Sequence, residues 1–109
     1  MKQDATTPEA EAQFDEVLAA LGPDVKRSQM MGRPCITTGG KMVACLTQDR
    51  LAVKLGRDSD VFASALRLDG AMVFEPGPGR QFKDWVAVPL SEADEWVRLA
   101  VAAVEHQRG

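Results

Sequence analysis

Two adjacent glycines, Gly39 and Gly40, constrain the fold of this chain more than any other feature of its sequence. They separate two short segments that read as strands, Pro34–Thr38 and Lys41–Thr47. Glycine readily adopts the positive φ that a two-residue hairpin turn requires. The sequence therefore predicts a β-hairpin centred on this pair.

A regular two-residue turn also determines which residues of the hairpin lie opposite one another. Cys35 should then face Ala44. By the same count, Cys45 should face Pro34. Because successive side chains of a strand point to opposite faces of a sheet, the two cysteines should project from opposite faces. A disulfide between them is then sterically disfavoured, although a shift of one residue would reverse this conclusion.

The same register divides the predicted sheet into two faces. One face should form the core beneath the helices and carries Cys35, Met42, Ala44, Leu46, Leu51, Val53 and Leu55. The other face mixes small apolar groups with cations and carries Ile36, Lys41, Val43, Cys45, Arg50, Ala52 and Lys54. A half-apolar outer face of this kind is either a subunit contact or a tolerated surface.

Hydrophobic periodicity and turn residues predict the other elements. Helices are expected at about residues 8–21 and 58–68, and from a cap at Ser91 to near the C-terminus. Strands are expected at about residues 25–31, 34–38, 41–47, 51–55, 71–74 and 84–89. Glu75–Lys83 is dense in proline and glycine and is predicted to be a loop. This order predicts the α+β class, with a mainly antiparallel sheet of about six strands in a two-layer arrangement with the helices.

Composition bounds the type of protein. The chain has 109 residues, of which 45% are hydrophobic and 27% charged, so a disordered chain is excluded and one domain is expected. We expect a flexible N-terminal tail at residues 1–7 and a single domain at 8–109. The acidic, polar start is unlike a signal or transit peptide, and no apolar run approaches the roughly 20 residues of a membrane span. These features predict a cytoplasmic protein with reduced cysteines and no membrane partner.

The charge is unevenly distributed, although the net charge is only −3 and the isoelectric point about 5.1. Residues 1–24 carry one cation and six anions, residues 25–57 seven cations and one anion, and residues 58–109 five cations and nine anions. A basic centre between acidic flanks can steer an acidic partner. Alternatively, acidic helices and a basic sheet neutralise one another within the fold.

Groups typical of catalysis are sparse. The single histidine, His106, is expected in the last turn of the final helix, where it complements the helix dipole. Cys35 and Cys45 lack the spacing of a redox or zinc site. We therefore predict a non-enzymatic protein with no metal and no cofactor.

The segment with the most binding potential is the predicted loop and the strand after it. Gly77 and Gly79 permit close backbone approach to a ligand. Arg80 and Lys83 could hold an anion. Trp85 offers a face on which a ligand could stack. The alternative is a tight structural connection whose charged side chains are solvated.

Three segments resemble the TfoX/Sxy N-terminal domain family. Residues 25–32 (VKRSQMMG) are similar to its Arg-x-Met-Phe-Gly opening, and residues 41–44 and 50–55 (KMVA and RLAVKL) to its Lys-x-Phe-Ala … Leu-x-Leu-Lys hairpin. Residues 74–86 (FEPGPGRQFKDWV) resemble the Phe-x-Pro … Arg-x-Met-Lys-x-Trp stretch of small stand-alone relatives of the MmcQ/YjbR-like type. Met31 stands where the family often has Phe, and Pro34-Cys35 replaces a Gly-rich step.

This resemblance implies an α+β fold of the secretion-chaperone-like type. Full-length TfoX/Sxy proteins are linked to regulation of natural competence and carry a second, C-terminal domain. MmcQ/YjbR-like proteins are often described as DNA-binding. The family has no catalytic motif to carry over.

Three functional hypotheses follow. The first is a non-enzymatic regulatory domain that acts through a protein partner or as a homodimer. The second is a nucleic-acid-binding module, against which the acidic isoelectric point argues; its contacts would be Lys41, Arg50, Lys54, Arg80 and Lys83. The third is a small-anion site at Gly77–Lys83.

Overall fold

The computed structural model describes residues 6–30 and 32–109. In these residues the helices are α1 (Pro8–Leu21), α2 (Asp60–Leu66) and α3 (Trp96–Arg108), with short 3-10 helices η1 (Gly22–Asp24) and η2 (Leu90–Glu95). The strands are β1 (Lys26–Met30), β2 (Arg33–Thr38), β3 (Lys41–Thr47), β4 (Arg50–Lys54), β5 (Met72–Gly77) and β6 (Arg80–Pro89). Of the expected tail, residues 1–5 lie outside the described part of the chain.

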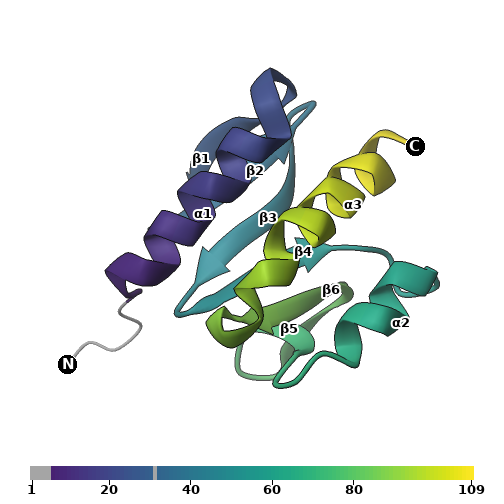
Figure 1. The fold of residues 1–109 in the computed structure, drawn as a ribbon. Coiled ribbons are helices and arrows are strands. Elements are labelled where there is room, and N and C mark those ends of the chain that lie inside the picture. The colour runs from purple at the N-terminus through teal and green to yellow at the C-terminus, as the bar shows by residue number, and fades with distance from the viewer. Residues whose placement is uncertain (1–5, 31) are drawn as a thin grey trace.

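The strands form one antiparallel sheet in the order β1-β2-β3-β4-β6-β5. The helices lie together on one face of this sheet (Figure 1). The predicted α+β class is therefore confirmed. None of the helices in residues 6–30 and 32–109 is long and apolar enough to cross a membrane.

Helix α1 begins where its sequence predicts and is tied to the sheet at its first turn. The Thr7 hydroxyl accepts a hydrogen bond from the Ala10 amide at 3.2 Å, and Pro8 occupies a position whose N–H would have no helical partner. The Thr7 amide donates to Oδ1 of Asp49 at 3.0 Å. This contact anchors the start of the helix to the β3–β4 turn.

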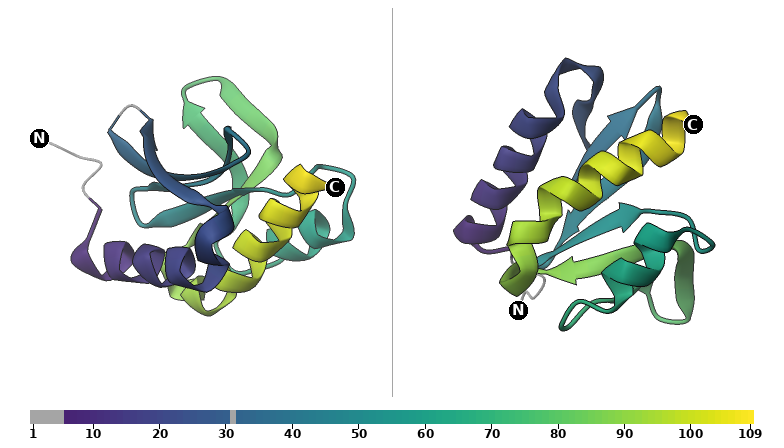
Figure 2. Two further views of the ribbon diagram at one scale, coloured as in Figure 1. Left: turned by 90° about the horizontal axis from the view of Figure 1, so that it is seen from above. Right: turned by 45° about the vertical axis from the view of Figure 1, so that its right-hand side comes forward.

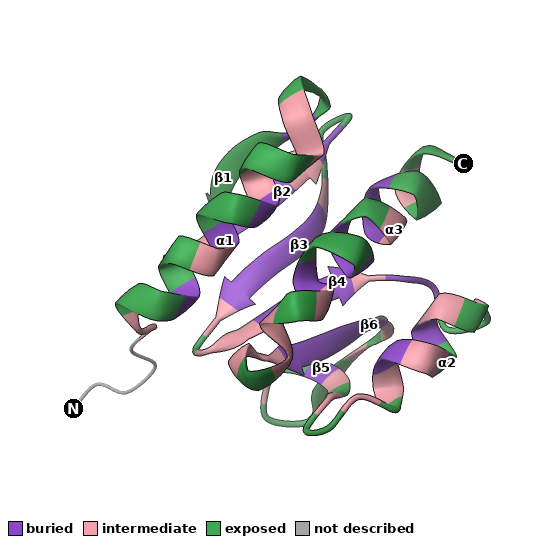
Figure 3. Ribbon diagram, in the orientation of Figure 1, coloured by how far each residue is buried: buried purple, intermediate pink, exposed green. Residues whose placement is uncertain are grey.

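The helix-facing side of the sheet carries the larger core (Figure 3). Five residues predicted for this face are buried here, namely Ala44, Leu46, Leu51, Val53 and Leu55. Ile36 and Val43 also belong to this core, although they were predicted for the outer face. Cys35 and Met42, predicted for the core beneath the helices, lie in or against the cluster on the other face.

A β-bulge in the β2–β3 hairpin causes this exchange. Thr38 pairs with Lys41 as the two-glycine turn requires, but Ile36 pairs with Ala44, so Val43 is an extra residue on β3. One extra residue shifts the register and reverses which face each side chain occupies. Cys35 therefore lies opposite Cys45, and the prediction that the two cysteines project from opposite faces is wrong.

The face away from the helices is concave, because the sheet curls until its two ends rise on either side (Figure 2). A second buried cluster fills this concavity and consists of Cys35, Cys45, Ala52, Phe74, Trp85 and Ala87. Cys45 and Ala52 are completely buried. The prediction of an exposed, half-apolar outer face is therefore wrong for these two residues, because the curled sheet covers its own face.

A second irregularity bends the β5–β6 end of the sheet. Val73 pairs with Val86 and Phe74 with Phe82, so one step along β5 matches four steps along β6. Extra residues of this kind bend the strand that carries them. As a result, the tip of the β5–β6 hairpin folds toward the concave face (Figure 2).

Several predicted boundaries differ from the structure by one or two residues, and two regions differ by more. The predicted loop Glu75–Lys83 consists of the end of β5, a tight turn and the start of β6. Pro76 is compatible with a strand because β5 is at the edge of the sheet, and Pro78 lies in the turn. The last α-helix begins at Trp96 with Glu95 as its N-cap residue, because Leu90–Glu95 forms a 3-10 helix, so Ser91 is not its cap.

Candidate functional site

The five cations predicted to contact an anion do not gather at one place. Arg50 begins β4 opposite Pro89, whereas Lys54 ends β4 opposite Trp85. Lys41 and the residues at the start of β6 belong to the same end of the sheet as Lys54. Lys54 Nζ donates to Oε1 of Gln107 on α3 at 3.4 Å. Arg50 therefore lies apart from the other four cations.

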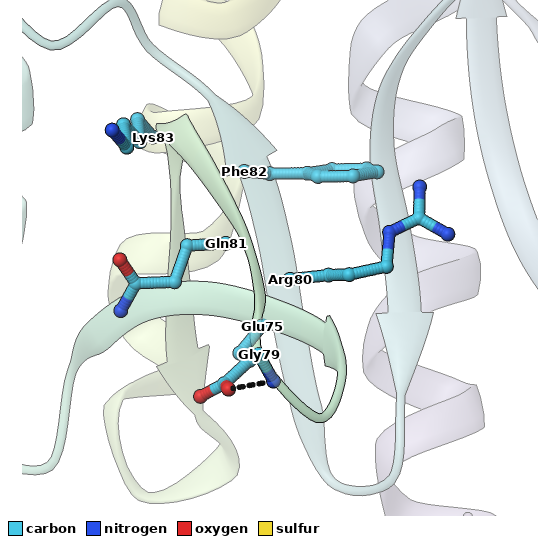
Figure 4. A pocket seen from close by; sticks show the side chains of 6 residues that line it. All are labelled: Glu75, Gly79, Arg80, Gln81, Phe82 and Lys83. Carbon is cyan, nitrogen blue, oxygen red and sulfur yellow. Dashed lines mark hydrogen bonds between the residues drawn. The ribbon is translucent and has the colours of Figure 1, made fainter.

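The β5–β6 hairpin separates the two cations predicted to hold an anion there. Arg80 and Phe82 project from one side of β6, and Gln81 and Lys83 from the other (Figure 4). Arg80 and Lys83 therefore cannot hold one small anion together. Gly79 lies in the turn, where its amide donates to Oε2 of Glu75 at 3.0 Å.

Two other residues predicted for this binding loop lie within strands. Gly77 ends β5 and pairs with Arg80. Trp85 lies within β6, is 6% exposed and packs against Phe74 and Phe82 at ring-centroid distances of 6.0 and 5.9 Å. Its faces are used inside the concave cluster, so it offers no stacking platform to a ligand.

A different pocket, of about 320 Å³, opens on the concave face at the end of the sheet that holds Arg50. It is lined by Arg33, Thr47, Gln48, Arg50, Met72, Phe74, Glu75, Pro76 and Ala87. Phe74 and Ala87 are buried and continue the concave cluster, whereas Met72 is 49% exposed. The pocket thus combines cationic groups with an apolar wall. We call it the two-arginine pocket.

The charge in this pocket is predominantly positive. Arg50 uses Nη1 to donate to the Gly70 carbonyl at 2.8 Å, which orients a guanidinium that has further N–H donors. Arg33 lies close enough to the concave cluster for its charge to lower the pKa of both cysteines, although burial, the larger effect, raises both. The carboxylate of Glu75 already accepts the hydrogen bond from Gly79.

Gln48 lies at the rim of the two-arginine pocket with φ of +54°. The left-handed region costs a residue with a side chain roughly 1–2 kcal/mol, so glycine would be the easier choice in this turn. Unfavourable backbone conformations of this kind occur often at ligand sites. The strain is consistent with a binding role for the turn.

Arg33 is the site residue that the sequence reasoning missed. One signal was available: in an antiparallel meander, β2 and β4 run in the same direction and start at the same end of the sheet. Arg33 and Arg50 are the first residues of these strands. The approach of these two arginines to Phe74 has no comparable signal in the sequence, because it depends on the curl of the sheet.

A second polar group surrounds the start of α2. Asp84 Oδ1 accepts from the amide and from Nε of Arg57, each at 3.0 Å, and these bonds lower the pKa of the Asp84 carboxyl. His106 lies in the last turn of α3 and packs closely over Gly56. The Ser59 hydroxyl donates toward main-chain carbonyls and accepts from Phe62, so it caps α2. These contacts describe a structural junction.

No protein-family model, curated protein or solved structure matches this chain.

Proposed function

We propose that this chain is a non-enzymatic binding domain that holds a small organic anion in the two-arginine pocket. The observation that carries the proposal is the placement of Arg33 and Arg50 around one pocket whose wall is Phe74 and Ala87. Guanidinium groups bind carboxylates and phosphates through pairs of N–H donors. The ligand class is therefore a small carboxylate or phosphate with an apolar ring or chain.

The size and lining of the pocket support this ligand class. A volume of about 320 Å³ lies at the lower end of the range for small-molecule sites. An apolar body next to Phe74 and Met72 would bury hydrophobic surface that a bare inorganic ion cannot use. Aromatic acids should accordingly bind more tightly than acetate or inorganic phosphate.

The other two hypotheses drawn from the sequence remain predictions. Each lacks part of the arrangement of residues that motivated it. The homodimer rested on a half-apolar outer face, but Cys45 and Ala52 are buried within the single chain. The nucleic-acid hypothesis used five cations, of which Arg50 lies at the opposite end of β4 from Lys54. The resemblance to TfoX/Sxy N-terminal domains still suggests the secretion-chaperone-like fold and regulation through a protein partner, and a bound anion would give such a regulator its signal.

Thermal unfolding with a panel of anions tests the proposal. Acetate, inorganic phosphate, benzoate and phenyl phosphate are compared at constant ionic strength. At ten times its Kd, a ligand that binds only the folded state stabilises it by about 1.4 kcal/mol, which corresponds to a rise in Tm of roughly 5–10 °C for a domain of this size. We expect the aromatic anions to raise Tm at lower concentration than acetate or phosphate.

Matched variants show which residues bind the anion that raises Tm. Arg33→Gln should abolish the shift in Tm, and Arg50→Lys should weaken it while keeping the charge. Lys41→Gln, an exposed cation at the other end of the sheet, should leave it unchanged. The proposal is overturned if no anion changes Tm, or if Arg33→Gln and Arg50→Lys both keep the full wild-type shift in Tm.

A further inference from the structure

Four sulfur-containing side chains gather on the concave face of the sheet. Cys35 and Cys45 are buried in the concave cluster, and Met30 and Met42 pack against it. They come from three adjacent strands, β1, β2 and β3. We call Met30, Cys35, Met42 and Cys45 the sulfur cluster.

The β-bulge at Val43 creates this cluster by placing Cys35 directly opposite Cys45. Directly opposed residues of antiparallel strands have Cα atoms roughly 4.5–5.5 Å apart, so their side chains meet. Both thiols are free. The register makes the two cysteines immediate neighbours without a covalent bond between them.

The methionines flank Cys35 from both neighbouring strands. Ser28 pairs with Cys35 across β1 and β2, so Met30 occupies the diagonal position. Met42 pairs with Thr37 and is diagonal to Cys35 on the other side. Both methionines are only partly buried.

The surroundings of the thiols are apolar except for a few main-chain groups and one cation. Cys35 Sγ donates to the Arg33 carbonyl at 3.3 Å, and the Met30 amide donates to the Cys35 sulfur. Burial, together with the neighbouring Cys35, raises the pKa of Cys45 to about 12.

We propose that the sulfur cluster is a binding site for a soft monovalent metal ion, Cu(I) being the biologically available example. Thiolate and thioether sulfurs are the ligands that Cu(I) prefers. Structural zinc normally takes four nitrogen, thiolate or carboxylate ligands. No group of three or more His, Cys, Asp or Glu side chains suited to a metal occurs in residues 6–30 and 32–109. The donor set thus favours Cu(I) over zinc.

Binding exchanges the two thiol protons for the metal ion. One Cu(I) ion and two neutral thiols give a dithiolate complex of charge −1 and release two protons to solvent, with no change in oxidation state. Arg33, whose charge already acts on both cysteines, partly compensates the negative charge. Met42 or Met30 can add a neutral thioether without changing the charge.

Anaerobic competition for Cu(I) tests this proposal. Reduced protein is titrated against the coloured Cu(I)–bathocuproine disulfonate complex, and we expect one equivalent of Cu(I) to be withdrawn. Cys35→Ser and Cys45→Ser should each abolish the withdrawal. Met42→Leu should weaken affinity by about tenfold, the lower end of what losing a supporting contact costs a metal site. Met72→Leu, a matched change at an exposed methionine of β5, should have no effect.

X-ray absorption of the copper-loaded wild-type protein provides a second readout that does not depend on the folding of any variant. The expected first coordination shell contains sulfur alone. Failure of the wild type to compete for Cu(I), nitrogen or oxygen in the first shell, or full competition by folded cysteine variants would overturn the proposal. Arg50 lines the two-arginine pocket and plays no part in the sulfur cluster, so Arg50→Lys should weaken anion binding and retain Cu(I) binding, and each proposal can fail separately.

Discussion

At the scale of single residues, Gly56 shows how a missing side chain determines a contact between elements. Its φ is +84°, and a Cβ atom there would lie 2.6 Å from Cε1 of His106. Gly39 has φ of +59° with nothing within 4 Å of the same position. Both glycines therefore adopt a positive φ, but only Gly56 has another side chain packed against the position of a Cβ atom.

This difference predicts unequal costs of substitution. Gly39→Ala should lower the free energy of unfolding by about 1–2 kcal/mol through backbone strain alone. Gly56→Ala should cost a further 1–3 kcal/mol or so, because the His106 ring must move. Urea denaturation of both variants measures the difference, and adding His106→Ala should remove the excess at Gly56. Equal costs at the two glycines would contradict the packing argument.

Asp84 predicts a pH dependence of stability. Hydrogen bonds from Arg57 lower the pKa of the folded carboxyl below its ordinary value of 3.8. The stabilisation is therefore present above the unfolded pKa and is lost as pH falls through the lower, folded pKa. Because the Asp84 side chain is 38% exposed, it should amount to less than about 1 kcal/mol.

The measurement compares Asp84→Asn with wild type by urea denaturation at neutral pH and at a pH below the folded pKa. The variant should be less stable at neutral pH, and the difference should shrink in acid. Asp69→Asn, at an exposed position, serves as the control. A difference that stays constant with pH would show that the carboxylate charge is not what Arg57 stabilises.

At the scale of elements, the β5–β6 hairpin is held over the concave face by aromatic contacts. Phe82 meets Phe74 edge to face at a centroid distance of 5.5 Å, and both contact Trp85. Phe82→Ala should therefore loosen the hairpin and expose Trp85. We expect a red shift of tryptophan emission and faster amide exchange in residues 75–82. Gln81→Ala, on the opposite side of the same strand, should cause neither change (Figure 4).

Most elements follow from local patterns in the sequence. Helix α1 and strand β3 have their predicted bounds, because capping residues and alternation determine them without help from distant contacts. The hairpin from Glu75 to Lys83 was missed because its prolines and glycines read as a loop. Pro76 is compatible with a strand because β5 is at the edge of the sheet, and edge position is a property of the topology.

The bulge at Val43 could not be predicted from alternation either. Val43 and Ala44 both lie in the helix-facing core, so two successive apolar residues share one face. A regular strand and a bulged strand differ here by one residue, and both place apolar groups inward. Packing against the helices decides between them, which is why Cys35 was assigned to the wrong face.

At the scale of the whole molecule, the candidate sites depend on the curl of the sheet. Arg33 and Arg50 share one end because of strand direction, which the sequence implies. Their approach to Phe74 requires both the bulge at Val43 and the bend in β6. The sequence therefore predicts cations at this end but not the pocket that they line.

An NMR titration with sodium benzoate at constant ionic strength tests most directly the claim that the two-arginine pocket binds an organic anion. The measured quantity is the chemical shift of each backbone amide. If the concave pocket is the binding site, saturable shifts should concentrate at Arg33, Gln48, Arg50 and Phe74. Shifts that concentrate at Arg80–Lys83, or the absence of any saturable shift, would contradict the claim.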